Sequence, residues 1–148
     1  MESLSDILDF AIEREQQAAD FYSDLVNIVS LDSMKATFAG FSKEELRHKA
    51  KLLSIKESGA LQSPQETILD LKIANYMVGI ETSASMNYQD ALIVAMQREK
   101  AAFQLYSDLS EKIDDPDLKK AFQALAHEEA KHKLYFESEY DEKVLTDN

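Results

Sequence analysis

Two related stretches of sequence decide how this chain folds: EELRH at residues 44–48 and EEAKH at residues 128–132. In each stretch a glutamate precedes a histidine by three positions, and another glutamate lies 30 positions before that one. The six residues are Glu15, Glu45 and His48 in the first half, and Glu99, Glu129 and His132 in the second. Residues three apart lie on the same face of an α-helix. The stretches therefore predict two helices that each present a carboxylate and an imidazole on one side.

Apolar residues recur at intervals of three and four along four segments, which is the spacing of an amphipathic helix. The segments are residues 8–29, 34–55, 92–113 and 118–136. The six Glu and His residues fall on the apolar stripes of these segments and not on their polar faces. Only three Gly and two Pro interrupt the 148 residues, which favours long helices over a sheet of many strands. We therefore predict an all-α protein.

Capping signals define the ends of the predicted helices. The signals are Ser3 with Asp6, Asn87 with Asp90 and Asp115 with Pro116 at three helix starts, and Gly59 at the C′ position of the second helix. Because the gaps within the first pair and within the second pair of helices are short, each pair is predicted to form an antiparallel hairpin.

The hairpins are joined by a longer segment, and we predict one domain over residues 1–148. The hairpins cover residues 4–58 and 87–140, and the crossover covers residues 59–86. A fifth, shorter helix is expected within the crossover, with the apolar residues Ile68, Leu69, Ile73, Met77 and Ile80. Two hairpins joined by one long crossover have the topology of a ferritin-like four-helix bundle.

The two halves of the sequence also repeat at an offset of 84 positions. Matching pairs include Leu8 and Leu92, Arg14 and Arg98, Tyr22 and Tyr106, Phe38 and Phe122, and all three pairs of Glu and His residues. An internal duplication predicts a pseudo-two-fold axis. Each half would then donate one Glu and one Glu-x-x-His to a site on that axis.

Four carboxylates in an apolar interior would repel one another and lose their hydration unless cations compensate them. Two divalent ions balance the four negative charges. Carboxylates can bridge two ions while each imidazole binds one, which suits iron or manganese better than magnesium or calcium. A single Glu-x-x-His recurs by chance in many helical proteins, but a duplicated set favours a metal site. We predict two iron ions per chain, with manganese as the alternative.

Other polar residues near these positions have weaker patterns. Tyr22 and Tyr106 each follow a ligand glutamate by seven residues, two turns along the same face. They are either hydrogen-bond donors or redox-active phenols beside the metal, or tyrosines of the core. Glu44 and Glu128 flank the inward glutamates on the solvent side, and His127 has no counterpart in the repeat and is expected to be exposed.

Composition excludes several classes of function. The net charge of −12 argues against nucleic acid, because phosphates would be repelled. The absence of Cys excludes disulfides, Cys-ligated zinc, iron–sulfur clusters and thiol catalysis. No window approaches the length of about 18 apolar residues needed for a membrane span, and the N-terminus does not look like a leader. A cytoplasmic protein is expected.

Residues 11–22 (AIEREQQAADFY), residues 95–99 (AMQRE) and the two Glu-x-x-His stretches together resemble the rubrerythrin-type, ferritin-like di-iron carboxylate family. The resemblance spans essentially the whole chain. It implies a di-iron site with the six ligands above, and it places Tyr22 and Tyr106 in the Glu-x6-Tyr positions of the family.

The sequence departs from that family in two respects. Rubrerythrins carry a rubredoxin-like domain with four iron-binding Cys, whereas this sequence has no Cys. They also carry an extra glutamate one turn after the ligand of the third helix, where this chain has Ala102, matched in the repeat by Ala18. The resemblance therefore implies a symmetric six-ligand site and a reductant supplied by another molecule.

Three functions are compatible with these patterns. The first is a peroxidase that reduces hydrogen peroxide to water with electrons from an external donor. The second is a ferroxidase or iron-handling protein that oxidises Fe(II) with oxygen. The third is a helical module that is stabilised by its metal and has no turnover. Bundle families also lead us to expect a homodimer.

Overall fold

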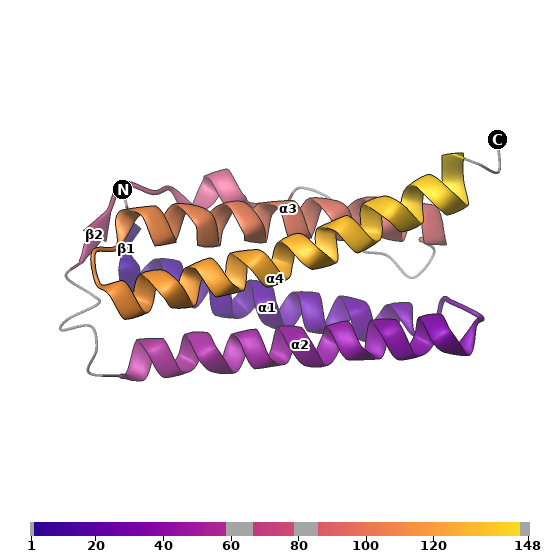
Figure 1. Ribbon diagram of the computed structural model, residues 1–148, viewed down its shortest axis with the longest axis horizontal. Helices are drawn as coiled ribbons and strands as arrows, with labels where there is room; N and C mark the ends of the chain where they lie inside the picture. Colours follow the sequence, from indigo (N-terminus) through magenta and orange to yellow (C-terminus); the bar gives the residue numbers. More distant parts are fainter. Residues whose placement is uncertain (1, 59–66, 79–85, 146–148) are drawn as a thin grey trace. The chain divides into compact units, whose positions relative to one another are not determined.

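The computed structural model describes residues 2–58, 67–78 and 86–145 of the chain. These residues divide into two compact units, Met1–Asn75 and Tyr76–Asn148. Each unit is built around one pair of long helices (Figure 1). The prediction that residues 1–148 form a single domain stays a prediction, and the two units are described separately.

The first unit contains helices α1, Leu4–Leu25, and α2, Asp32–Glu57. The two helices run antiparallel and pack against each other along a hairpin (Figure 1). A polar contact also joins the two helices. The Ser42 hydroxyl of α2 donates a hydrogen bond of 2.8 Å to the Ala19 carbonyl of α1. The predicted first hairpin is therefore confirmed.

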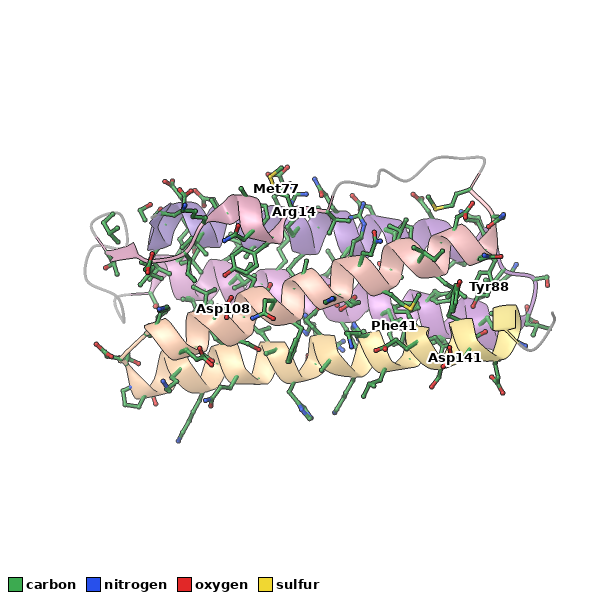
Figure 2. All side chains as sticks on the ribbon, turned by 90° about the horizontal axis from the view of Figure 1, so that it is seen from above. Arg14, Phe41, Met77, Tyr88, Asp108 and Asp141 are labelled. Atoms are coloured by element: carbon green, nitrogen blue, oxygen red, sulfur yellow. The ribbon has the colours of Figure 1, made fainter. Side chains whose placement is uncertain are left out.

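The second unit contains helices α3, Tyr88–Lys112, and α4, Pro116–Tyr140, which form the second predicted hairpin. At its open end the Tyr88 hydroxyl donates a hydrogen bond of 3.1 Å to Glu139 Oε1. Figure 2 shows Tyr88 and Asp141 at this end of the unit. Because Tyr88 begins α3 and Glu139 lies in the last turn of α4, this contact holds the free ends of the hairpin together.

The helix starts follow the predicted capping signals. The side chains of Ser3, Asn87 and Asp115 accept hydrogen bonds of 2.8 to 3.1 Å from backbone amides three positions later, at the starts of α1, α3 and α4. Helix α2 differs, because its N-cap is Leu31 and no side chain caps it. The predicted C′ residue Gly59 lies outside the described residues.

The crossover contains a short helix, but one smaller than predicted. Ile73–Tyr76 form a single 3₁₀ turn, η1. Ile68–Leu69 form strand β2, which pairs antiparallel with strand β1, Glu2–Ser3. Placing Ile68 and Leu69 in a helix was therefore wrong. Met77 follows η1 in irregular structure, and Ile80 lies outside the described residues.

The strand pairing has a clear physical cause. The N-terminal residues before α1 are extended and carry backbone groups that no helix satisfies. The register pairs Glu2 with Leu69 and Ser3 with Ile68, and the Leu4 amide donates to the Thr67 carbonyl at 2.7 Å. These contacts satisfy one of the orphan amides at the start of α1, which a helical crossover at this place would not do.

The internal repeat is confirmed at the level of elements. A shift of 84 positions carries Leu4, the start of α1, onto Tyr88, the start of α3. The same shift carries Asp32, the start of α2, onto Pro116, the start of α4. The two hairpins are therefore two copies of one structural unit. The pseudo-two-fold axis stays a prediction.

Each helix buries one face that combines apolar side chains with predicted ligands. In α2 the buried residues are Phe38, Glu45, His48, Leu52 and Ile55. In α4 they are Leu118, Phe122, Leu125, Ala126, Glu129, His132 and Phe136. The ligands thus lie on the apolar stripes, as their spacing predicts. Among the described residues, no helix has both the length and the apolar character of a membrane span.

Candidate metal centre

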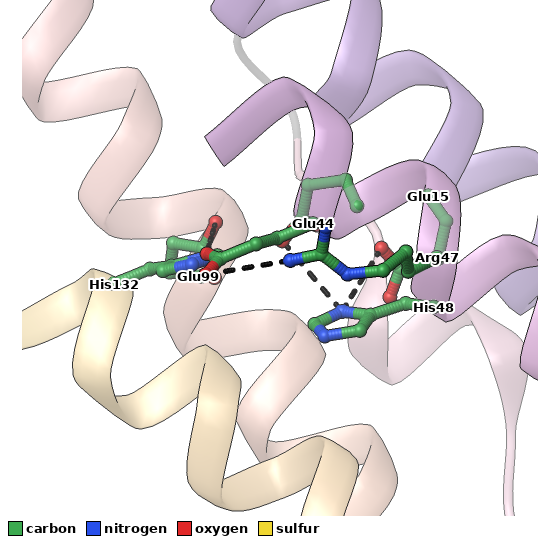
Figure 3. A network of polar contacts seen from close by, with 7 residues as sticks. Glu15, Glu44, Arg47, His48, Glu99 and His132 are labelled. Atoms are coloured by element: carbon green, nitrogen blue, oxygen red, sulfur yellow. Dashed lines mark ion pairs between the residues drawn. The ribbon is translucent and has the colours of Figure 1, made fainter. Parts of the chain in front are cut away.

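The first hairpin brings three of the predicted ligands together. Glu15 lies in the middle of α1, and Glu45 and His48 lie one turn apart on the buried face of α2. His48 Nδ1 lies 3.6 Å from Glu15 Oε2 and 3.7 Å from Glu45 Oε1. Figure 3 shows the His48 ring with dashed lines from its nitrogen to the carboxylates. One ligand atom from each residue lies within 4.8 Å of the others.

The second hairpin assembles the corresponding three residues in the same way. Glu99 comes from α3, and Glu129 and His132 come from α4. His132 Nδ1 lies 3.6 Å from Glu99 Oε1, and one ligand atom from each of the three residues lies within 4.8 Å of the others. Each half of the chain therefore presents two carboxylates and one imidazole as a cluster.

The two clusters are buried, and their charges therefore need compensation. All six side chains have relative exposures of only 1 to 4%. Within one cluster a protonated histidine would still leave one excess negative charge, because each cluster has two carboxylates. Taking such a charge out of water costs several kcal/mol. One divalent cation per cluster, with a neutral imidazole, makes the cluster neutral.

The distances within the clusters also fit a metal ion. Hydrogen bonds between nitrogen and oxygen are usually about 2.7 to 3.2 Å long, so the separations of 3.6 and 3.7 Å at the histidines are too long. Nitrogen and oxygen ligands about 2.0 to 2.2 Å from one transition-metal ion lie about 3 to 4 Å apart. The donor set of carboxylate and imidazole suits iron, manganese or zinc and lacks the thiolates of soft-metal sites. The residues present therefore fit a metal ion in each cluster.

The tyrosines predicted near the metal are buried in the hairpins. Tyr22 is fully buried and Tyr106 is 1% exposed. The Tyr22 ring of α1 packs edge-on against the Phe41 ring of α2, with centroids 5.8 Å apart. This contact makes Tyr22 part of the packing of its hairpin. A role of either hydroxyl at the metal stays a prediction.

The neighbours of the ligand residues face solvent, as predicted. Glu44 is partly exposed and lies 3.7 Å from the guanidinium of Arg47, which is itself 69% exposed. Glu128 and His127 are exposed on α4. The helical stripe therefore predicts which glutamate of each Glu-Glu pair is buried.

One buried polar contact could not be found from sequence. The Tyr76 hydroxyl of η1 donates a hydrogen bond of 2.6 Å to Asp108 Oδ2 of α3. Burial, this hydrogen bond and the Asp108 charge together raise the pKa of Tyr76 above its usual value. A single tyrosine in a crossover has no periodicity and no motif. The contact fastens the end of the crossover to the second hairpin.

One class of helical metal proteins has carboxylate and histidine ligands in a fixed pattern. The pattern is a glutamate on one helix and a Glu-x-x-His on the next, present in two copies. The sequence profile of the rubrerythrin family matches residues 6–140. The chain therefore belongs to the rubrerythrin family, whose members are typically di-iron oxidoreductases. Its fold is the ferritin-like four-helix bundle of that family. The sequence has no Cys and so contains no rubredoxin-like iron site.

Comparison with solved structures agrees with the family assignment. A hypothetical protein from Pyrococcus furiosus is similar, with a TM-score of 0.71 and 27% sequence identity. The match covers 94% of this chain and 89% of that protein. No curated protein shows significant sequence similarity to the chain.

Proposed function

We propose that this protein is a di-iron redox protein that reduces hydrogen peroxide with electrons from an external donor. One observation supports the proposal above all others. A chain of the rubrerythrin family buries the same three donors, two carboxylates and one imidazole, twice. Such a symmetric set with two histidines favours a retained cofactor over iron that passes through as substrate.

In this proposal each cluster holds one iron ion, which gives two per chain. The four ligand glutamates would hold the ions, and His48 and His132 would each hold one through Nδ1, the nitrogen that faces the carboxylates. When bound in the ferrous state, the ions supply the two electrons that convert hydrogen peroxide and two protons into two water molecules. The external donor then returns the electrons.

The chain's own residues control the surroundings of this chemistry. The buried carboxylates neutralise two divalent ions, so the loaded site has no excess charge. The apolar stripes around the ligands exclude bulk water and favour a small neutral oxidant such as peroxide or oxygen. With all six ligands 1 to 4% exposed, a large organic substrate has poor access to them.

We further propose that Tyr22 and Tyr106 place a hydroxyl near each cluster, where it donates a hydrogen bond or a proton. Because Phe fills nearly the same volume, Tyr22→Phe and Tyr106→Phe should keep the fold and the bound iron. The peroxide reaction should then slow by about tenfold or more, within the range of general-acid effects. Unchanged rates in both variants would leave core packing as the role of these residues.

The test is anaerobic loading with Fe(II), followed by stopped-flow mixing with peroxide and, separately, with oxygen. We expect the peroxide reaction to be much faster than the oxygen reaction. Glu45→Gln should abolish this reaction, whereas Glu44→Gln, a change at the exposed neighbour, should preserve it.

The other outcomes identify the alternatives. A faster reaction with oxygen, followed by release of ferric iron, would replace the peroxidase with a ferroxidase. Metal that raises the melting temperature but reacts with neither oxidant would leave a metal-stabilised module. Tight binding of manganese in place of iron would also contradict the proposal.

A further inference from the structure

A line of side chains on α4 leads from the cluster of the second hairpin to the open end of that hairpin. His132 belongs to the cluster, and Tyr135 and Glu139 follow it at steps of three and four residues. Such steps keep the three side chains on one side of the helix. Glu139 lies about 10.5 Å along the helix axis from His132, at 1.5 Å per residue. Electrons tunnel through packed protein over distances of this order.

A tyrosine from the neighbouring helix meets this line at its outer end. The hydroxyl of Tyr88, the first residue of α3, donates a hydrogen bond of 3.1 Å to Glu139 Oε1 (Figure 2). The side chains of Tyr88, Tyr135 and Glu139 are each partly exposed. The Tyr135 ring also packs edge-on against the ring of the fully buried Phe136, with centroids 5.5 Å apart. This end of the hairpin therefore combines two phenols with one carboxylate.

The hydrogen bond determines how Tyr88 can lose an electron. Burial, the charge of Glu139, the hydrogen bond to it and the nearby Tyr135 raise the pKa of Tyr88 above its usual value. The phenol therefore keeps its proton at neutral pH. A phenol that loses an electron becomes a strong acid, and a carboxylate in hydrogen-bond contact can accept its proton. Tyr88 thus has the base that its oxidation requires already in place.

The internal repeat shows that this arrangement belongs to the second hairpin alone. At an offset of 84 positions, the two tyrosines and the glutamate correspond to Leu4, Lys51 and Ile55. None of these residues is aromatic or carries a carboxylate. Leu4 and Ile55 are buried, so the corresponding end of the first hairpin is closed by apolar side chains. Packing at this end does not require a phenol paired with a carboxylate, and the metal cluster is duplicated without that pair.

We propose that Tyr88 donates one electron to the iron site of the second hairpin, with Glu139 as the acceptor of its proton. The proposal rests on the proposed function and applies when a single ferrous ion is available. Hydrogen peroxide then takes one electron from the ferrous ion and one from Tyr88. One-electron reduction alone would leave a hydroxyl radical, so the electron from Tyr88 completes the reduction to water.

The reaction balances in atoms and electrons. One ferrous ion, the Tyr88 phenol, the Glu139 carboxylate, hydrogen peroxide and two protons from solvent give one ferric ion, the Tyr88 phenoxyl radical, protonated Glu139 and two water molecules. The O–O bond of peroxide and the O–H bond of Tyr88 break. The external donor then reduces the radical at its partly exposed position, and the proton returns from Glu139.

The first test loads the full chain anaerobically with one Fe(II) per chain, adds hydrogen peroxide without a donor and freezes the mixture rapidly. Electron paramagnetic resonance should show a tyrosyl radical, whose signal narrows when the protein contains ring-deuterated tyrosine. Tyr88→Phe should abolish this signal. Tyr140→Phe is the matched control, because Tyr140 is also partly exposed and lies in the last turn of α4. This variant should keep the signal.

The second test uses the metal-free chain and therefore does not depend on iron. A soluble photo-oxidant removes single electrons after a laser flash, and absorbance follows the tyrosyl radicals. The part of the reaction that disappears in Tyr88→Phe belongs to Tyr88. Glu139→Gln keeps a hydrogen-bond acceptor but loses the basic carboxylate, so it should slow this part by about tenfold or more, within the range of general-base effects. Glu137→Gln, which changes a carboxylate bonded to Lys133, should leave it unchanged.

Three results would overturn the proposal. The first is an iron-loaded chain that reacts with peroxide and forms no tyrosyl radical. The second is a radical that survives Tyr88→Phe. The third is equal oxidation of Tyr88 in wild type and Glu139→Gln. Circular dichroism checks that each variant keeps its helices. A chain that binds no iron would overturn the proposed function as well, and the metal count identifies that case separately.

Discussion

Two adjacent glutamates in the second long helix, α2, face in different directions, and only one of them is buried. Glu45 is 1% exposed and its carboxylate lies 3.7 Å from His48 Nδ1, whereas Glu44 faces Arg47 near the surface. Sequence alone predicts this choice, because only a step of three from the histidine keeps the glutamate on the apolar stripe. The separations between donor atoms could not be predicted, since they depend on how the two helices of a hairpin pack.

Because Glu45 is buried beside a second carboxylate, we predict that the effect of Glu45→Gln on the melting temperature changes sign when metal is bound. In the presence of chelator, Glu45→Gln should melt at or above the temperature of wild type, because it removes one of two buried negative charges that lie close together. With metal present the same variant should melt below wild type, because a ligand is lost and tight binding stabilises only the folded state. Thermal unfolding by circular dichroism measures both, with Glu44→Gln as the control. A variant that is destabilised equally in both conditions would contradict the assignment of Glu45 as a ligand.

The hydrogen bond from Tyr76 to Asp108 predicts a loss of stability at alkaline pH. Its cause is the raised pKa of Tyr76 in the folded protein, which results mainly from burial. The folded state keeps this proton after the unfolded state has lost it, so the stabilising contribution is complete below pH 10, the usual pKa of tyrosine, and falls as the pH rises further. Urea unfolding between about pH 8 and 11 should show a shallower decline in Tyr76→Phe than in wild type. An identical decline would contradict this account.

At the scale of elements, the four long helices follow from periodicity and capping residues in the sequence. The first hairpin was predicted to cover residues 4–58. In the structure α1 begins at Leu4 and α2 ends at Glu57, so the two ranges agree to within one residue. The strand pair was missed because two residues are too few to show a period of two. It depends on contacts between residues 2–3 and 68–69, which are distant in sequence. Long, strongly periodic segments are thus predictable, and short pairings between distant segments are not.

The unequal caps of the two hairpins give a prediction about helix stability. Leu31 caps α2 without a side-chain hydrogen bond, whereas its counterpart in the repeat, Asp115, accepts one of 3.0 Å from the Leu118 amide. Leu31→Asp should therefore raise the free energy of unfolding, and Asp115→Ala should lower it, each by about 1 kcal/mol. Equilibrium unfolding in urea measures both. A destabilising Leu31→Asp would show that this exposed leucine contributes more by packing than a cap would.

At the scale of the whole molecule, the chain consists of two hairpins of common design, and the family match over residues 6–140 gives their fold. The repeat offset of 84 and the paired ligands were sufficient to predict this fold from sequence. The assembly of hairpins and of subunits depends on surfaces that meet only after the helices form, and hydrophobic periodicity does not encode which surfaces meet.

The central claim is that each of the two clusters holds one metal ion, and counting the bound metal tests it most directly. Anaerobic titration with Fe(II), with iron measured after removal of the free ion, should saturate at two irons per chain. His48→Ala and His132→Ala should each lower the stoichiometry or weaken binding by at least about tenfold, as expected for loss of a ligand. His127→Ala, a change of the exposed histidine, should leave it at two. A wild-type chain that binds no iron, or binds it equally well without His48 and His132, would contradict the account.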